Sequence, residues 1–244
     1  MVKLTVLTNV YNEEYLLPFW LEHHRTIFDH GIVFDWGCTD RSMDIVREMC
    51  PTWEIRKAPY EKFDAFENDV LFMHAEMEID GYKLGLNTTE FLVSPEPIRT
   101  YLTEEPNGYY PLTSHIALST KDKQDPTTLR ELFDGIEYIE TGERQFRMIH
   151  SCDHGHYSLG RHERTLPVTG WILPVVLWFG EYPWNTQILK RGLQIESRVP
   201  LSDYEKGIGH QHFFTVEQRI ERRNRHLQVS VPVQKFPHIV SSLL

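Results

Sequence analysis

Three short polar stretches carry residue types that could bind a charged ligand and do chemistry on it. The stretches read TNVYNEE at 8–14, DWGCTD at 35–40 and NTTEF at 87–91, and each follows a short apolar run. Their carboxylate, amide and hydroxyl groups can hydrogen-bond a polar ligand, coordinate a cation or move a proton. If the apolar runs are neighbouring parallel strands, the polar stretches meet at the carboxyl edge of one sheet, where α/β proteins bind ligands.

The elements that would position these stretches alternate between strand and helix patterns over the first 95 residues. Short apolar runs predict strands at 3–8, 31–35, 53–57 and within 81–93. Helical spacing predicts helices that begin near Asn12 and Glu13, over 39–50 with Thr39 or Asp40 as its cap, and over 64–79 with Phe66, Val70, Met73 and Met77 facing inward. This alternation predicts an α/β fold with a mostly parallel central sheet flanked by helices.

The pattern changes after residue 95. Strands of a mixed sheet are predicted at 108–120, 136–140 and 144–151, and helices at 127–134, 183–195 and 214–228. The apolar run GWILPVVLWFG at 170–180 predicts a buried strand pair or the wall of a second binding site. Because no linker separates two domains, we predict a single domain over 1–244, with a ligand-binding half at 1–95, a second half at 96–228 and an irregular tail at 229–244.

In this order and spacing, the three polar stretches resemble the nucleotide-binding half of family-2-like glycosyltransferases with the GT-A fold. LTNVYNEEYLLPFWLEHH, IVFDWGCTDRS and GYKLGLNTTEFL are similar to the family's segments hhT.YNE, hhDdGStD.S and hhhlD.DEF, where h is apolar. The resemblance covers roughly the first 95 residues and extends more faintly to 191–212. It implies a GT-A-like fold, a nucleoside diphosphate sugar as donor, with uridine the expected base, and a hydroxyl of a glycan or glycoconjugate as acceptor.

Carried over position by position, the resemblance implies that Thr8, Tyr11 and Glu13 contact the base and ribose, and that Asp35 accepts a hydrogen bond from the uracil ring. Glu13 could instead be an acid in the first turn of a helix, and Asp35 a turn residue at a strand end. Trp36 departs from the family pattern and could stack on a base or close the core. The expected nucleotide-sugar-binding residues are Thr8, Asn9, Tyr11, Asn12, Glu13, Asp35, Asn87, Thr89, Glu90, Arg161, Lys190 and Arg191.

In the family, the aspartates of the D.D motif hold a divalent ion between the donor's two phosphates. Asn87 and Thr89 stand at those positions here, and neutral oxygens are poor sole ligands for a hard cation, so only Glu90 keeps a charge. Mn²⁺ or Mg²⁺ could still be held by Glu90 with His210 or His212. The favoured alternative is no metal, with cations that offset the charge of the leaving diphosphate: Lys190, Arg191, Arg161 or Arg198.

The histidine-rich stretch HSCDHGHYSLGRH at 150–162 could be a metal cluster or a polar loop at the acceptor site, and the loop is the preferred interpretation. Asp153 is our first candidate for the general base of an inverting transfer, because it follows a predicted strand. Asp203 is the second candidate and could equally be a helix cap. Two other functions stay open: a catalytically silent sugar-nucleotide or glycan binder, which NTTEF favours, and a His/Asp metallohydrolase, which leaves the other motifs unexplained.

Composition excludes several classes of protein. The formal net charge of -10 repels polyanions, so no nucleic acid partner is expected, and the arginine-rich stretch at 219–228 is predicted to be a solvated helical face. Three cysteines without metal spacing indicate a reducing compartment, and we expect the cytoplasm. Because a strand pattern starts at the first residues, no leader is expected. No membrane span is expected either, because no apolar run approaches the roughly 20 residues that it needs.

Overall fold

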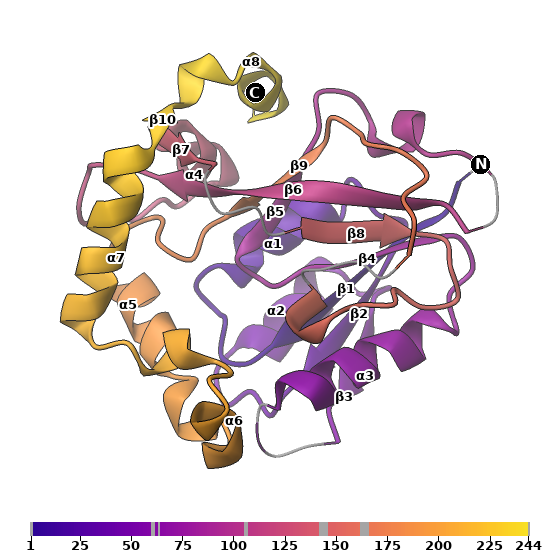
Figure 1. Cartoon of the computed structure of the whole chain (residues 1–244), viewed down its shortest axis with the longest axis horizontal. Helices are drawn as coiled ribbons and strands as arrows, with labels where there is room; N and C mark the ends of the chain where they lie inside the picture. Colours follow the sequence, from indigo (N-terminus) through magenta and orange to yellow (C-terminus); the bar gives the residue numbers. More distant parts are fainter. Residues whose placement is uncertain are drawn as a thin grey trace.

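The computed structural model describes residues 2–59, 62, 64–104, 107–141, 146–161 and 166–243. Within these ranges, ten strands form one continuous sheet in the order β10-β7-β6-β8-β4-β1-β2-β3, with β9 paired to β6 and β5 paired to β9 (Figure 1). The sheet therefore runs through both predicted halves of the chain.

The first half of the sheet is parallel. Its strands are β1 (Leu4–Val10), β2 (His30–Asp35), β3 (Glu54–Lys57) and β4 (Tyr82–Gly85), at the places where the sequence predicts strands. β2 and β4 lie on either side of β1, and both pair with it in parallel. The order of the strands thus reverses beside β1, which opens a crevice at the carboxyl ends of β1 and β4.

Helices cover both faces of this parallel half. α1 (Leu17–His24) and α2 (Ser42–Met49) pack on one face, and α3 (Ala65–Glu76) packs on the other. α1 begins later than predicted because Pro18 occupies its first turn, so Asn12 and Glu13 lie in the loop between β1 and α1. These two side chains therefore lie near the carboxyl end of β1 and are positioned by the loop rather than by the helix.

The predicted inward stripe of α3 is wrong at Phe66 and Met77, whereas Val70 and Met73 are half-buried. Phe66 and Met77 are each 63% exposed. The buried side of the helix carries three polar residues and two apolar ones: Asn68, Asp69, Glu76, Phe72 and Ala75. A helix that buries acids needs partners for them elsewhere in the chain. These partners, Arg161 for Asp69 and Tyr157 for Glu76, come from the second half of the chain.

The second half of the sheet is mixed. β8 runs antiparallel between β4 and β6, β9 runs parallel to β6, and β5 runs antiparallel to β9. The predicted mixed sheet is confirmed, and the mostly parallel character is confined to the first half. The strands of this half are β5 (Glu90–Val93), β6 (Tyr109–Leu118), β7 (Tyr138–Glu140), β8 (Phe146–His150), β9 (Val175–Trp178) and β10 (Val231–Pro232).

The remaining helical segments all follow residue 97, and those between residues 186 and 229 lie along one side of the molecule (Figure 1). They are η1 (Ile98–Tyr101), α4 (Leu129–Asp134), η2 (Leu159–Arg161), α5 (Thr186–Leu193), η3 (Glu196–Arg198), α6 (Leu201–Glu205), η4 (His210–Phe213), α7 (Val216–Val229), η5 (Val233–Lys235) and α8 (Pro237–Leu243). Within the described ranges, every helix is too short or too polar to cross a lipid bilayer.

Two predictions for the C-terminal part differ from the structure. The expected irregular tail forms β10, η5 and α8, and it buries Val233 and Ile239 against the core. The arginine-rich helix α7 is not a fully solvated face, because Arg219 and Arg223 are buried. Arg219, Arg222 and Arg223 turn toward the interior at the edge of the crevice, whereas Arg225 is exposed.

Candidate functional site

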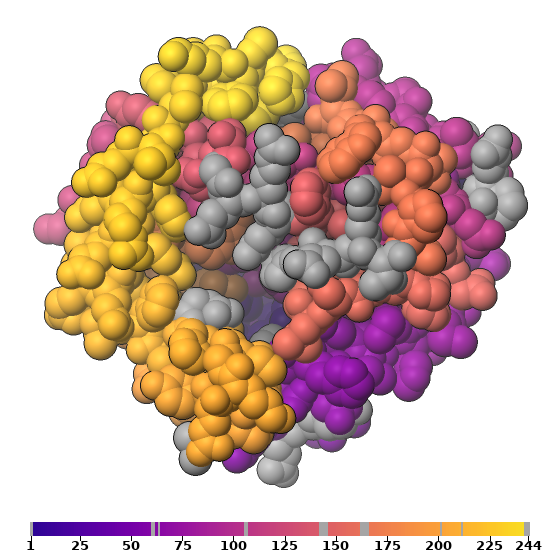
Figure 2. Space-filling view, viewed as in Figure 1, coloured from indigo at the N-terminus to yellow at the C-terminus, as the bar shows by residue number. Residues whose placement is uncertain are grey.

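A cavity of about 1190 Å³ lies at the carboxyl edge of β1 and β4. The ends of these strands, the first turns of α3, parts of β6 and η2, and the segment from α5 to α7 line it. Figure 2 shows the hollow between α7 in yellow, the α5–α6 segment in orange and the body of the sheet. The cavity is thus formed jointly by the N-terminal and C-terminal halves.

The structure brings most of the predicted site residues together. Those that line the cavity are Asn9, Tyr11, Glu13, Asn87, Thr89, Glu90, Arg161, Arg191, Asp203, His210 and His212. Those that do not line it are Thr8, Asn12, Asp35, Asp153, Lys190 and Arg198. The polar stretches that follow β1 and β4 therefore open onto one space, whereas Asp35 at the end of β2 does not reach it.

Glu90, at the start of β5, holds the loop after β4 in place. Its Oε2 accepts from the backbone N of Asn87 at 2.8 Å and from Nε of Arg147 at 2.8 Å. Its Oε1 accepts from Nδ2 of Asn87 at 3.2 Å and from Nη2 of Arg147 at 2.5 Å. The side chains of Arg147 and Glu90 are only 2% and 5% exposed, so this is a buried two-pronged ion pair.

The GT-A resemblance implies a divalent ion at this loop, and the residues present do not fit one. A carboxylate has about four lone-pair sites, and hydrogen bonds from Asn87 and Arg147 take up those of Glu90. A metal ion there would also lie next to the positive guanidinium of Arg147. Over the described ranges, no three His, Cys, Asp or Glu side chains converge as a metal site would require.

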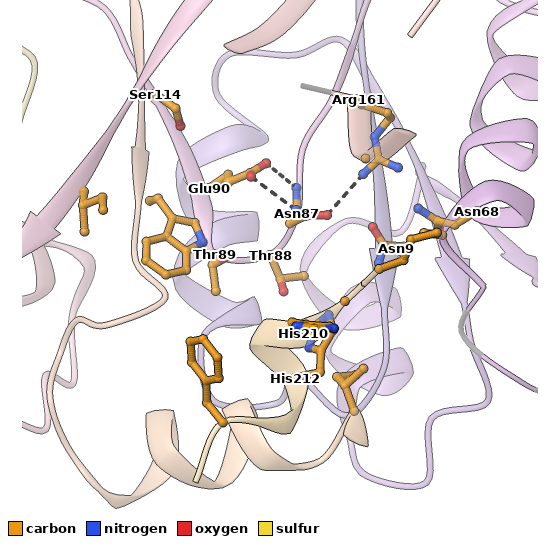
Figure 3. Close-up of a pocket in the computed structure, with 18 of the residues that line it drawn as sticks. Asn9, Asn68, Asn87, Thr88, Thr89, Glu90, Ser114, Arg161, His210 and His212 are labelled. Atoms are coloured by element: carbon orange, nitrogen blue, oxygen red, sulfur yellow. Dashed lines mark hydrogen bonds between the residues drawn. The ribbon is translucent and has the colours of Figure 1, made fainter. Parts of the chain in front are cut away.

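Arg161 connects this loop to the polar side of α3 (Figure 3). Its Nη1 donates to Asp69 Oδ1 at 2.8 Å and its Nη2 to Asn87 Oδ1 at 3.2 Å, while its guanidinium lies 4.0 Å from the ring centre of Phe72. The backbone N of Gly160 donates to the other oxygen of Asp69 at 2.7 Å. Burial lowers the pKa of Arg161, and Asp69 opposes that shift. These contacts explain why α3 turns its acids inward.

Glu13 and Arg191 form a second ion pair in the wall of the cavity. Nε of Arg191, on α5, donates to Oε2 of Glu13 at 2.6 Å. Burial raises the pKa of the Glu13 carboxyl, and the positive charge of Arg191 partly offsets this rise. The backbone N of Glu13 donates to Oγ of Ser42 at 2.8 Å, so the loop after β1 is anchored to α2. The segment that carries Arg191 thereby lies over the carboxyl end of β1.

Asp35 and Asn12 organise a loop rather than the cavity wall. Oδ1 of Asp35 accepts from the backbone N of Gly37 at 3.0 Å and of Cys38 at 2.8 Å. Oδ1 of Asn12 accepts from the backbone N of Thr39 at 2.8 Å. Side-chain to backbone bonds of this kind stabilise turns, so the turn-residue alternative for Asp35 is the one consistent with its contacts.

Trp36 and Thr8 lie at the base of this region. Trp36 is 1% exposed and packs with Leu7, Phe34 and Phe72, although part of it also borders the cavity. Thr8 is 1% exposed in β1. Both side chains therefore support the site from the core, and neither presents a large surface to a ligand.

His212, on η4, lines the cavity as a neutral imidazole. Burial, together with the positive charges of Arg191, Arg219 and Arg222, lowers its pKa to about 4. Above that pH the ring is uncharged, with one nitrogen that can accept a hydrogen bond and one that donates. His210 lines the same part of the cavity and is more exposed.

The inward arginines of α7 have identifiable partners. Nε of Arg222 donates to Oε1 of Glu181 at 2.5 Å, and His226 contacts the other oxygen of Glu181 at 2.8 Å. Nη2 of Arg223 donates to the carbonyl oxygen of Ser119 at 2.7 Å. The spacing of 219, 222, 223 and 226 places these side chains on one helical face, a periodicity that counting charges alone overlooks.

Asp153 is the catalytic candidate that the structure separates from the others. It is exposed in the loop after β8. That loop turns toward α3 because the backbone N of Gly155 and the hydroxyl of Tyr157 both donate to Glu76, at 2.7 and 2.6 Å. Asp203, on α6, is 6% exposed and lines the cavity.

The histidine-rich stretch does not form a metal cluster within the described residues. His154 and His156 stack on each other at 3.9 Å, and His150 approaches Tyr157 OH at 3.0 Å beneath the loop. His162 lies outside the described residues. The contacts of the described histidines are those of a structured polar loop.

Several cavity residues escaped the sequence analysis. Asn68 on α3, Arg147 on β8, Ser114 on β6 and Trp178 on β9 all line the cavity. The side-chain oxygens of Asn9 and Asn68 are buried and have no hydrogen-bond partner within the described part of the chain. Figure 3 places Asn9, Asn68 and Arg161 on one side of the cavity and Ser114 on the other.

No protein-family model matches the chain, and no curated protein matches it. Among solved structures, S. aureus TarS is similar over 51% of this chain and 23% of its own, with 17% identity and a TM-score of 0.35. TarS 1-349, solved with UDP-GlcNAc, overlaps 52% of this chain and 37% of its own, with 16% identity and a TM-score of 0.34.

Glucosyl-3-phosphoglycerate synthase from Mycobacterium tuberculosis, solved with Mn²⁺, uridine diphosphate and glucosyl-3-phosphoglycerate, overlaps 47% of this chain and 44% of its own, with 15% identity and a TM-score of 0.34. The chain therefore spans less than half the length of each of these solved proteins.

Proposed function

We propose that the protein is a glycosyltransferase that moves a sugar from a nucleoside diphosphate, with uridine as the expected base, to a hydroxyl of a glycan or glycoconjugate. One observation carries the proposal: the polar ends of the adjacent parallel strands β1 and β4 open, together with Arg191, onto one cavity. This is the position at which open α/β sheets bind nucleotides. The cavity volume of about 1190 Å³ exceeds the usual 300–1000 Å³ of a small-molecule pocket, which leaves room for donor and acceptor together.

The donor is proposed to lie against β1, β4 and α3. The unpartnered side-chain oxygens of Asn9 and Asn68 favour a polar ligand there, because a buried acceptor without a hydrogen bond costs about 1–3 kcal/mol. Tyr11 and Glu13 line the same cavity at the positions that the GT-A resemblance assigns to the nucleotide. Asp35 does not line it, so its expected contact with uracil is not part of the proposal.

The acceptor is proposed to enter from the side of β6 and β9, where Ser114 and Trp178 line the cavity. Asp203 is the proposed general base: its carboxylate lines the cavity and makes no hydrogen bond within the described ranges. Asp203 takes the proton of the acceptor hydroxyl as that oxygen bonds to the anomeric carbon. The bond from this carbon to the diphosphate oxygen breaks at the same time, and the configuration at the carbon inverts.

Thermal shift and calorimetry with a panel of nucleoside diphosphates and their sugars test the donor part of this proposal. We expect UDP or a UDP-sugar to bind and to raise the unfolding temperature. If no nucleoside diphosphate and no nucleotide sugar binds, the proposal of a glycosyltransferase is refuted.

The base is tested by the rate at which the bound donor is hydrolysed or transferred. We expect Asp203→Asn to lose activity by at least about a hundredfold with donor affinity retained. If Asp153→Asn abolishes turnover and Asp203→Asn does not, the base assignment reverses.

A catalytically silent nucleotide-sugar binder is the second candidate function. It is favoured by one observation, the complete engagement of Glu90 by Arg147 and Asn87 at the loop where the family holds its metal. The two functions separate cleanly in experiment. A silent binder gives a calorimetric signal with the donor and no release of UDP under any acceptor or hydrolysis condition, whereas a transferase releases UDP.

A further inference from the structure

Neither a metal ion on Glu90 nor Arg147 can balance the negative charge of a diphosphate bound at the loop after β4. A different positively charged group must therefore do so. Glu90 has no lone pair left for a metal ion, and Arg147 directs its Nε and Nη2 to Glu90 and its Nη1 to the carbonyl oxygens of Gly160 and Arg161. Arg147 is also only 2% exposed. Neither member of this pair can turn to a ligand without breaking buried, charge-assisted hydrogen bonds.

The other cations predicted for this role differ in what they can still bind. Arg161 is 3% exposed and uses Nη1 and Nη2 on Asp69 and Asn87. Arg198 donates to the carbonyl oxygen of Trp36 and does not line the cavity. Lys190 is exposed and lies outside the lining.

Arg191 is the exception. It lines the cavity, its side chain is 25% exposed, and its Nε is held by Glu13 at 2.6 Å. Its two terminal amino groups make no hydrogen bond to any residue that the structure describes. A guanidinium oriented through Nε and open at both terminal nitrogens can bind two phosphate oxygens at once.

We propose that Arg191, positioned by Glu13, binds the donor's diphosphate directly, and that the protein binds nucleoside diphosphates without a divalent metal. This inference rests on the proposed function. Glu13 acts as a positioning residue, since it fixes the rotation of the guanidinium and leaves the terminal nitrogens for the ligand. In the transfer itself, Arg191 would offset the charge that develops on the departing diphosphate.

Calorimetry with UDP and uridine, in EDTA and then in Mn²⁺, tests the metal part. We expect the same UDP affinity in both conditions, within about threefold. Electron paramagnetic resonance of Mn²⁺ gives a readout independent of catalysis: added protein should take up no Mn²⁺ beyond what UDP binds alone. Binding of UDP that requires Mn²⁺ overturns the metal-free inference and leaves the proposed function standing.

Arg191→Met tests the direct contact. Loss of hydrogen bonds to a charged phosphate should weaken UDP by about tenfold to a hundredfold and leave uridine affinity unchanged. Lys206→Met is the matched control, because Lys206 is exposed beside α6 and lies outside the cavity lining. It removes the same charge, so an equal loss in this variant would indicate general electrostatics and contradict a specific contact.

Arg191→Met leaves the buried Glu13 carboxylate without its partner, so the folding of this variant must be checked by circular dichroism. Glu13→Gln/Arg191→Met removes both charges and keeps the test valid if the single variant unfolds. Undiminished UDP affinity in the folded variant overturns the role of Arg191. Absence of binding by UDP and by every other nucleotide to wild-type protein, with and without Mn²⁺, refutes the proposed function instead.

Discussion

Glu90→Gln tests how strongly the buried ion pair with Arg147 holds the floor of the cavity. The two side chains are 5% and 2% exposed, and Arg147 contributes two of the hydrogen bonds that Glu90 accepts. The substitution preserves the shape of Glu90 and leaves the guanidinium charge buried without a counter-charge. Breaking such a pair typically costs about 3–5 kcal/mol, a large part of the roughly 5–15 kcal/mol that stabilises a domain.

Urea denaturation followed by tryptophan fluorescence measures this cost as the change in the free energy of unfolding. Asp44→Asn is the matched control, because Asp44 pairs with Arg47 on the surface of α2 with side chains 63% and 62% exposed. It should cost less than about 1 kcal/mol. Glu90→Gln/Arg147→Met should cost clearly less than the sum of its two single variants. A loss in Glu90→Gln no larger than in the control would refute the buried-pair reasoning.

Three further predictions concern the surrounding framework. The pKa of His212 is lowered to about 4, against about 6.5 in an unfolded chain, so the unfolded state binds more protons between these values. Unfolding free energy should therefore fall by up to about 3 kcal/mol as pH drops from 6.5 to 4, and His212→Gln should remove that component in denaturation curves across this range. Asn185 caps α5 through Oδ1, which accepts from two backbone N–H groups at 3.0 Å, and its Nδ2 donates to the Tyr15 hydroxyl and the Gln124 carbonyl oxygen at 2.6 Å. Asn185→Ala should therefore cost at least about 1–2 kcal/mol in urea denaturation, and Asn185→Asp should also be destabilising, because it keeps the cap but sets a carboxylate against the Gln124 carbonyl oxygen. A Cβ on Gly31 would lie 2.2 Å from the Trp53 ring, so Gly31→Ala should lower stability by about 1–3 kcal/mol; an unchanged melting temperature would show that the ring moves freely.

The parallel half of the fold could be predicted from sequence because its signals are local. β1, β2 and β4 are short, mainly apolar runs that are buried almost throughout. The edge strand β3 is more polar and only half-buried, but its place follows from the alternation of strands and helices. The polar stretches follow from the same pattern, since they begin where the apolar runs end. The sequence therefore predicts Glu13, Asp35, Asn87 and Glu90 at one edge of the sheet, and of these all but Asp35 line the cavity.

The inward side of α3 could not be predicted in the same way. Periodicity ranks Phe66 and Met77 above Asp69 and Glu76 as core residues, whereas the structure exposes the first two and buries the other two. The acids are stable inside because Asp69 meets Arg161 and Glu76 meets Tyr157, residues about 80 to 90 positions away in the chain. A single sequence carries no local signal for such distant partners, and Arg147 was missed for the same reason.

Charge balance explains why Arg191 differs from the arginines that support the cavity from the interior. Glu90 is matched by Arg147, Asp69 by Arg161 and Glu181 by Arg222, and in each case the acid is at least nine-tenths buried. Separating those pairs would leave charges in a poorly solvated interior, so they act as fixed supports. Arg191 also pairs with a buried acid, but its partner binds only Nε and its side chain remains a quarter exposed. An anion can therefore bind Arg191 without breaking an existing ion pair, which makes this residue the natural contact for a diphosphate in the cavity.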